Sequence, residues 1–266
     1  MTVPGMKFRA ESLRGRLVRG ETVIGTFVGI GHPAAVEVMG WRGFEAVCID
    51  SEHAPLGPGT IEAMVRAADV TGAQALVRVA AIGPEIGRAL DVGACGVVIP
   101  HVDTAEQARQ CVTAVRYPPV GERGAGPGRV TAYAQRFASY LGQANDSVTL
   151  MVQVETALGV RNAAEIAAVD GVDVVFVGPG DLAVSLGVAP GSAEHTHAIT
   201  TVLTTVQEAG KVCGIFCLTA ADMPRWVSAG VRFFLLGSDL GLLGEAAQSE
   251  LALAREAVSQ FEGSPA

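Results

Sequence analysis

Eight short apolar runs rich in β-branched residues recur along the chain, and each is followed by a stretch with helical periodicity. Strands that are apolar along their whole length are typical of a parallel sheet with both faces covered by helices. Eight such units within 266 residues predict a (β/α)8 barrel of the TIM type, and a doubly wound open sheet is the alternative. No G-x-G-x-x-G motif follows the first run, which argues against a dinucleotide-binding sheet. The predicted strands are 23–28, 46–50, 75–79, 96–100, 149–155, 173–178, 212–216 and 233–237.

Between these strands, apolar residues recur every three to four positions, which predicts helices. No stretch of linker composition divides the chain, so residues 1–266 are expected to form one barrel domain. The longest irregular segment, YPPVGERGAGPGR at residues 117–129, follows the fourth unit. We expect it to be a functional loop near the mouth of the barrel. The clearest predicted helices are 61–70, 106–115, 163–168 and 198–209, with a last helix at about 242–258.

The composition excludes several classes of partner. A formal net charge of −8 argues against nucleic acid and anionic membranes. No apolar stretch approaches the roughly 18 residues of a membrane span. Five cysteines at scattered positions indicate reduced thiols in a cytoplasmic protein. The basic residues near the start have no apolar run behind them, so they predict a short amphipathic helix and no secretory signal: Lys7, Arg9, Arg14, Arg16 and Arg19.

The second predicted strand ends in a cluster of polar residues, CIDSEHAP at positions 48–55. Such a cluster is either a surface turn or the rim of an active site. In a barrel the carboxyl ends of the strands carry the chemistry, which favours the rim. His53 then becomes a candidate proton-transfer group, and Asp50 would orient the loop or the histidine. Glu52 has the alternative of facing solvent.

Three further strands end in polar side chains that would share this rim. Arg78 lies near the end of the third strand, where its alternative role is one half of a structural salt bridge. Gln153 and Glu155 come from the fifth strand, and a buried carboxylate there is hard to explain structurally. Asp181 follows the Gly-Pro-Gly turn after the sixth strand and is either a ligand or the N-cap of a helix at 182–186.

These residue types suit the enolisation of a 2-oxo acid. Two carboxylates, Glu155 and Asp181, are suitable ligands for a hard divalent cation such as Mg²⁺. The N–H groups of Gly180 and Asp181, at a helix start, are positioned to hold a substrate carboxylate. A chelated cation would polarise the keto oxygen, Arg78 would support the enolate oxygen, and His53 would move protons.

The sequence resembles the HpcH/HpaI aldolases, metal-dependent class II pyruvate aldolases related to the citrate lyase β subunit. The resemblance extends from about residue 22 to residue 248. The combination of motifs is more specific than any single one. The matching stretches are GFEAVCIDSEHAP, ALVRV, IGRALDVGACGVVIPHVDTAEQAR, RYPPVGERG, VQVET and VFVGPGDLAVSLG.

The resemblance implies a (β/α)8 barrel whose last helix packs on a neighbouring subunit, in a hexamer built from dimers. It implies that Glu155 and Asp181 bind Mg²⁺, Mn²⁺ or Co²⁺. It also implies that Arg78 contacts pyruvate and stabilises the enolate, with Gln153 beside the bound pyruvate. The implied reaction is the reversible cleavage of a 4-hydroxy-2-oxo acid to pyruvate and an aldehyde.

The resemblance further implies that His53 is the base, acting directly or through a metal-bound water. Asp50 matches an aspartate that supports the histidine, and Asp91 matches another acid, near the subunit interface, with the same suggested role. The chain departs from the family after GERG, where it reads AGPGRVTAYAQRF with Ala134 in place of a usual glycine. In this loop Arg123 either binds a distal substrate carboxylate or anchors the loop, and we favour the anchor.

Other functions would use the same residues. Decarboxylation of oxaloacetate, or enolate addition to an unsaturated acceptor as in macrophomate synthase, would need the same pyruvate-enolate site. An acyl-CoA lyase is weaker, since the sequence shows no obvious basic site for a CoA phosphate. A non-catalytic barrel that binds a 2-oxo acid would not need the base, so His53 argues against it.

Overall fold

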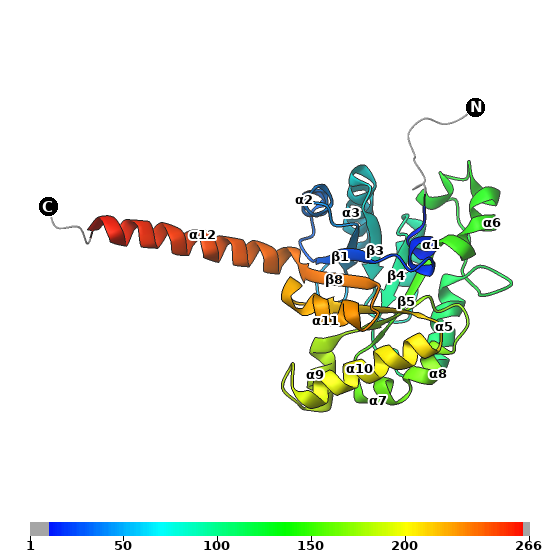
Figure 1. Cartoon of the computed structure of the whole chain (residues 1–266). Coiled ribbons are helices and arrows are strands. Elements are labelled where there is room, and N and C mark those ends of the chain that lie inside the picture. Colours follow the sequence, from blue (N-terminus) through cyan, green and yellow to red (C-terminus); the bar gives the residue numbers. More distant parts are fainter. Residues whose placement is uncertain (1–10, 263–266) are drawn as a thin grey trace.

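The computed structural model describes residues 11–262 and shows eight parallel strands closed into a barrel (Figure 1). Each strand pairs with the next one in the sequence, and β8 pairs with β1. The predicted (β/α)8 barrel is therefore confirmed, and the open sheet is excluded. The strands are β1 Val23–Val28, β2 Ala46–Asp50, β3 Gln74–Arg78, β4 Gly96–Ile99, β5 Thr149–Val154, β6 Val174–Val177, β7 Val212–Cys217 and β8 Phe233–Ser238.

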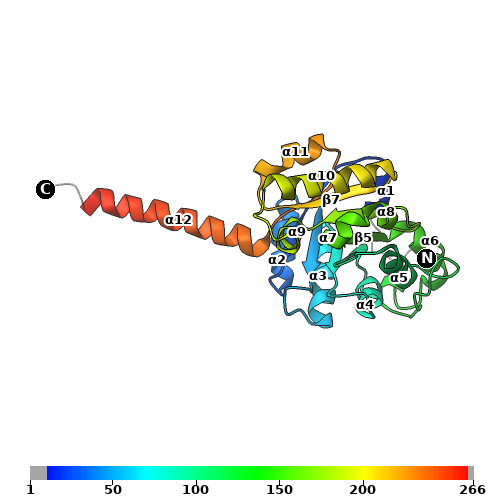
Figure 2. The same ribbon diagram turned by 90° about the horizontal axis from the view of Figure 1, so that it is seen from below.

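Helices surround the barrel on its outside, and Figure 2 shows them from a second direction. All the predicted strands and helices are present, with ends that shift by at most five residues. The α-helices are α1 Leu13–Val18, α2 Pro33–Trp41, α3 Pro58–Thr71, α4 Glu85–Asp91, α5 Ala105–Val115, α6 Phe137–Ser147, α7 Ala157–Arg161, α8 Ala163–Ala167, α9 Pro179–Leu186, α10 Ala193–Glu208, α11 Met223–Ser228 and α12 Asp239–Glu262. Two short 3₁₀ helices, η1 Arg129–Thr131 and η2 Ala220–Asp222, complete the elements.

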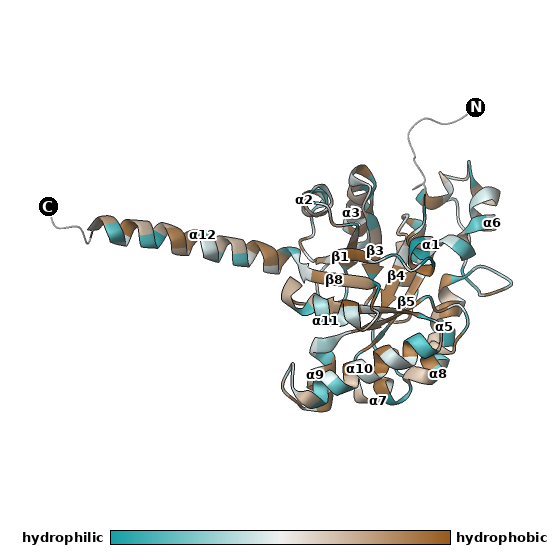
Figure 3. Cartoon of the chain, viewed as in Figure 1, coloured by the Kyte–Doolittle hydropathy of each residue, from teal (hydrophilic) through white to brown (hydrophobic). Residues whose placement is uncertain are grey.

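The strands are buried on both faces, and this explains their continuous apolar sequences. Alternate side chains fill the interior of the barrel, among them Phe27, Met151, Phe176 and Phe233. The others pack outward against the helices in a second, larger core, and Figure 3 shows the apolar colouring of the strands. At Gly96 a Cβ atom would lie 2.3 Å from the Thr149 carbonyl oxygen, so this crowded position excludes any side chain.

The amino-terminal end of the barrel is covered by α1. Leu13 and Leu17 of this helix are buried with the interior residues. Arg16 lies beside Glu45, with 2.5 Å between the guanidinium and the carboxylate. The predicted amphipathic helix is thus confirmed for its later half, while Lys7 and Arg9 lie outside the described residues.

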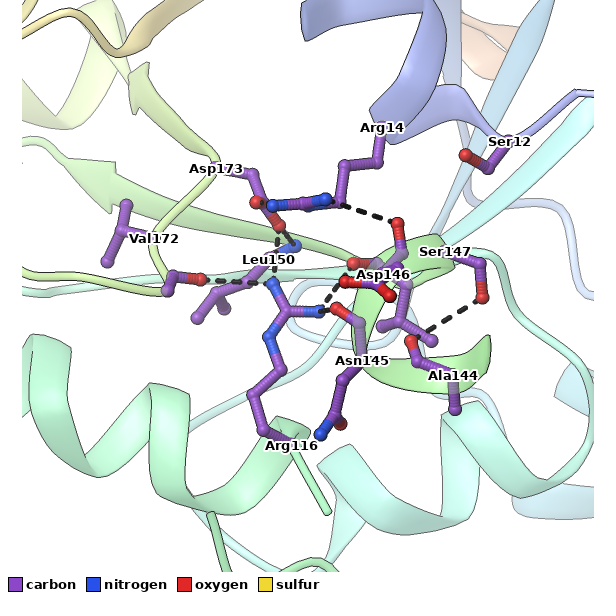
Figure 4. Close-up of polar contacts among 12 residues, drawn as sticks. Ser12, Arg14, Arg116, Ala144, Asn145, Asp146, Ser147, Leu150, Val172 and Asp173 are labelled. Atoms are coloured by element: carbon purple, nitrogen blue, oxygen red, sulfur yellow. Dashed lines mark hydrogen bonds and ion pairs between the residues drawn. The ribbon is translucent and has the colours of Figure 1, made fainter. Parts of the chain in front are cut away.

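A buried ion pair joins α5 to the start of β6 at the same end (Figure 4). Arg116 Nη2 donates to Asp173 Oδ2 at 2.6 Å and to the Gly171 carbonyl at 3.0 Å. Its Nη1 donates to the carbonyls of Asn145 and Val148 at 2.9 and 2.7 Å. Arg14 donates to the other oxygen of Asp173 at 2.7 Å. The network ties α1, α5, α6 and β6 together.

Residues 117–129 lie at this amino-terminal end and not at the mouth. Arg123 pairs with Asp91 at the end of α4, and Arg129 donates to the carbonyl of Val92 at 2.8 Å. The prediction of a functional loop near the mouth is therefore wrong. The segment follows α5 and leads back to the start of β5, so it is a helix-to-strand connection. Such connections meet the end of the barrel that faces away from the chemistry.

The last helix, α12, projects away from the barrel in both views (Figures 1 and 2). Its apolar side chains Leu243, Leu251, Val258 and Phe261 are exposed. They belong to a stripe with helical spacing along one side of the helix. Within residues 11–262, no helix is both long and apolar enough to span a membrane.

We predict that Arg116→Ala destabilises the protein by about 3–5 kcal/mol, because Asp173 and several carbonyl groups lose a buried cationic donor. Urea denaturation followed by circular dichroism measures this change. The control is Arg109→Ala, which breaks an exposed pair with Glu106 and should cost about 0.5 kcal/mol or less. Equal losses in the two variants would contradict a structural role for the Arg116 network.

Candidate active site at the carboxyl ends of the strands

A bidentate ion pair between Arg78 and Asp50 lies where β2 and β3 end. Arg78 Nε and Nη2 donate to the two oxygens of Asp50 at 2.9 and 2.8 Å, and both side chains are almost fully buried. The guanidinium also lies over the ring of Phe27, 4.4 Å from its centroid. Arg78 is thus both one half of a salt bridge and a member of the rim. Asp50 and the ring of Phe27 together fix the orientation of its guanidinium.

Asp50 also organises the loop that carries His53. Its Oδ1 accepts the backbone N–H groups of Glu52 and His53 at 3.1 and 3.3 Å. Burial alone would raise the pKa of Asp50, but the hydrogen bonds and charge of Arg78, with these two N–H groups, outweigh it and lower the pKa. Of the two suggested roles, orienting the loop is confirmed. The contacts of Asp50 with the loop are to its backbone and not to the imidazole.

Glu52 points inward, so the alternative that it faces solvent is excluded. Its side chain is only 10% exposed and its Oε2 lies 3.3 Å from Arg78 Nε. The same oxygen is 3.9 Å from Nε2 of His53, whose own side chain is 62% exposed. Burial raises the pKa of Glu52 against the opposing influence of Arg78 and the nearby histidines. The imidazole of His53 is therefore open to a ligand, with a carboxylate behind it.

Glu155 follows β5 and lies at the centre of the rim, with 1% of its side chain exposed. Its Oε1 accepts the backbone N–H of His101 at 2.8 Å, and its Oε2 contacts the amide nitrogen of Gln153. Burial raises the pKa of Glu155, and the negative charge of Asp181 raises it further. A Cβ atom at Gly178 would lie 2.7 Å from both Gln153 Nε2 and Glu155 Oε2, so the glycine makes room for this carboxylate.

Asp181 lies in the first turn of α9, which begins two residues earlier than Asp181 itself. Gly178 is the N-cap, and no side chain caps this helix, so the alternative of Asp181 as N-cap is wrong. The N–H groups of Gly180 and Asp181 belong to the first turn, where no intrahelical acceptor exists. His195 holds the turn: its Nδ1 accepts from the Gly191 N–H, so its Nε2 donates to the Pro179 carbonyl at 2.8 Å.

Glu155 and Asp181 fit a hard divalent cation. Both supply carboxylate oxygens, and Asp181 lies close enough to raise the cost of ionising Glu155, a cost that a shared cation would remove. Among the described residues, no group of three or more His, Cys, Asp or Glu side chains is arranged to hold a metal ion. Two protein carboxylates therefore leave the remaining positions to water and substrate, as is usual for Mg²⁺.

Asp91 does not join this cluster. It ends α4 at the amino-terminal side of the barrel, where its carboxylate pairs with Arg123 at 2.7 Å. His53 lies beyond the carboxyl end of β2, so the topology separates Asp91 from His53 of the same chain, and support of His53 across a subunit interface stays a prediction. Arg123 is buried and stacks on Tyr117 with 4.6 Å to the ring centroid. These contacts fit the preferred interpretation of Arg123 as a loop anchor and place its side chain away from the mouth of its own barrel.

Three residues with a part in this rim were not foreseen. His101 follows β4 and contacts Glu155, His195 holds the start of α9, and Asp239 accepts the N–H groups of Gly29 and Ile30 after β1, both at 2.9 Å. The signal for His101 was present in VVIPHVDT, because the residue directly follows a strand that ends at the same rim. His195 lies on α10, where its sequence neighbours do not distinguish it from any other helical residue.

Comparison with known proteins gives one consistent family. A model of the HpcH/HpaI aldolase/citrate lyase family matches residues 23–246. A hydroxypyruvate/pyruvate aldolase of Delftia acidovorans is 37% identical over 98% of both chains. A 5-keto-4-deoxy-D-glucarate aldolase of Klebsiella pneumoniae is 36% identical over 90% of this chain and 94% of its own. The crystal structure of an HpcH/HpaI family protein from Burkholderia cenocepacia, 35% identical, superposes with a TM-score of 0.87 over 91% of this chain and 98% of that one.

We predict that Glu155→Gln stabilises the metal-free protein at pH 8. The ordinary pKa of Glu is about 4.3, and the folded-state pKa of Glu155 lies above its usual value. The wild type therefore loses stability as the pH rises from about 4.3 through the raised pKa, whereas the amide has no charge to bury. Thermal unfolding in EDTA should give the variant the higher Tm at pH 8 and a smaller difference at pH 5. Glu106→Gln, an exposed carboxylate, is the control; a lower Tm for Glu155→Gln at pH 8 would refute the argument.

Proposed function

The chain belongs to the HpcH/HpaI aldolase/citrate lyase family, and we propose that it reversibly cleaves a 4-hydroxy-2-oxo acid to pyruvate and an aldehyde. Membership confirms the enzyme class expected from the sequence, an aldolase and hence a carbon–carbon lyase. The observation that carries the proposal is the convergence of Arg78, Glu155 and Asp181 on one rim. A fixed cation, two carboxylates and an exposed imidazole form a site that can stabilise an enolate and move a proton.

Arg78 would stabilise the negative charge that develops on the 2-oxo oxygen when the carbon–carbon bond breaks. Asp50 occupies Nε and Nη2 of the guanidinium, so a substrate would approach its Nη1 side. The ion pair with Asp50 and the stacking on Phe27 fix the guanidinium before a substrate arrives. Donors that are already oriented need no reorganisation during the reaction, which is the condition for effective electrostatic stabilisation.

Glu155 and Asp181 would hold a divalent cation, Mg²⁺, Mn²⁺ or Co²⁺. When bound, the cation supplies Lewis-acid polarisation of the substrate's keto group. The N–H groups of Gly180 and Asp181 would receive the substrate carboxylate, helped by the positive end of the α9 dipole. Gln153, beside Glu155, would contact the same half of the substrate.

His53 would take the proton from the 4-hydroxyl group in cleavage and return it in condensation. Its imidazole is exposed at the mouth, while Asp50 holds its backbone N–H and Glu52 lies behind the ring. An imidazole can both accept and donate a proton, which suits the two directions of this transfer.

The decisive test measures deuterium incorporation into the methyl group of pyruvate by NMR, with Mg²⁺ and with EDTA. We expect exchange that depends on the metal, and it needs no knowledge of the aldehyde. Arg78→Lys keeps the charge but loses the bidentate geometry, and should reduce the exchange rate about 100-fold. Wild-type protein that exchanges nothing in either condition would contradict the proposed enolate chemistry.

Assembly forms a second part of the proposal: a cytoplasmic hexamer built from dimers in which α12 packs on a neighbouring barrel. The support is the stripe of exposed apolar side chains on α12, since a helix that projects into water would not bury them. The five thiols, four of them buried, support a reducing compartment. The proposed partners are small molecules only, a 2-oxo acid and an aldehyde, with neither nucleic acid nor a membrane surface.

We predict that Leu251→Glu combined with Val258→Glu reduces the assembly to smaller species, because both residues are exposed on the apolar stripe of α12. Sedimentation velocity measures the change in mass. The matched control is Glu245→Gln with Glu256→Gln, on the same helix but outside the stripe, which should leave the mass unchanged. An unchanged mass in the first variant would contradict packing through this face.

A further inference from the structure

His101 has a strained backbone that directs its N–H into the rim. The residue follows β4 with φ 54°, in the left-handed region that non-glycine residues rarely adopt. In this conformation the His101 N–H reaches Glu155 Oε1 at 2.8 Å, and the next N–H, of Val102, reaches the Gln153 carbonyl at 3.1 Å. Strain of this kind persists only where the surrounding structure enforces it, and it is concentrated at functional sites.

The imidazole of His101 bridges two carboxylates from different loops. Its Nδ1 lies 3.2 Å from Glu155 Oε1 and its Nε2 lies 3.6 Å from Glu52 Oε1. The ring itself is 57% exposed, so it adds little to the hydrophobic core. Its contacts are with the polar groups of the rim, and a purely structural role would not place it there.

These contacts determine how Glu155 presents its oxygens. Oε1 receives both the backbone and the ring of His101, and Oε2 receives the amide of Gln153. The plane of the carboxylate is thereby fixed. Oε1 faces two nitrogen atoms of His101, whereas Oε2 meets one donor and keeps a lone pair for a cation. Through Glu52, which lies 3.3 Å from Arg78, the same imidazole connects the cation side of the rim to the guanidinium side.

We propose that His101 is a positioning residue, whose imidazole holds Glu155 in the orientation that binds the divalent cation. The inference rests on the proposed cation site and adds a residue to it that acts through Glu155. Groups that orient a metal ligand in this way typically contribute 10- to 100-fold to metal affinity.

The test compares His101→Gly and His101→Asn with the wild type. Both replacements tolerate a positive φ, so both keep the backbone N–H on Glu155 while they remove the imidazole. We expect the Kd for Mn²⁺, measured by electron paramagnetic resonance, to rise about tenfold in His101→Gly and less in His101→Asn. Pyruvate methyl exchange should fall at low Mn²⁺ and recover at saturating Mn²⁺, with Tm in EDTA unchanged. The control is His197→Asn, an exposed histidine on α10.

The possible outcomes separate this inference from the proposed function. An unchanged Kd in both His101 variants, next to a raised Kd in Glu155→Gln, would overturn the role of His101 and leave the cation site intact. Exchange that stays low at saturating Mn²⁺ would also overturn it, because the imidazole would then act on the reaction and not on metal binding. Wild-type protein that binds no Mn²⁺ would overturn the cation site itself.

Discussion

The ion pair between Arg78 and Asp50 is the interaction on which the rest of the site depends. Two buried charges are costly to remove from water, and a bidentate contact with additional N–H donors is the arrangement that offsets this cost. Asp50 satisfies the guanidinium with both oxygens and still accepts two backbone N–H groups from the loop of His53. One aspartate therefore orients the groups proposed to stabilise the enolate and to move the proton.

The carboxylates on the other side of the rim differ from Arg78, because they lack a strong partner of opposite charge among the described residues. Within residues 11–262, no guanidinium or ammonium group pairs with Glu155, whose pKa is raised by burial and by Asp181. A neutral residue at this position would give a more stable folded protein. The buried carboxylate is therefore best explained by its proposed role as a cation ligand. The charge of Arg78 is neutralised within the protein by Asp50, whereas the charges of Glu155 and Asp181 would be neutralised by the proposed cation.

The sequence was sufficient for the barrel and for most of the rim, because both depend on local patterns. Apolar runs locate the strands, and polar residues that directly follow those runs must lie at one end of the barrel. The errors arise where the connection type or a backbone conformation decides. Residues 117–129 have the length and composition of a loop at the mouth of the barrel, but they follow a helix and lead to a strand, which places them at the opposite end. The role of His101 depends on a positive φ that no propensity of histidine predicts.

Stability and chemistry lie at opposite ends of the barrel. The amino-terminal end holds the buried helix α1, the Arg116–Asp173 network and the anchored loop, in which Arg123 pairs with Asp91. The carboxyl end holds the strained His101, the costly Glu155 and the exposed His53. A protein with only a small margin of stability can keep such features when the elements that carry them are held firmly elsewhere. The eight strands run from one end to the other. The ion pairs at the amino-terminal end therefore stabilise the same barrel that carries Glu155 and His53 at its carboxyl end.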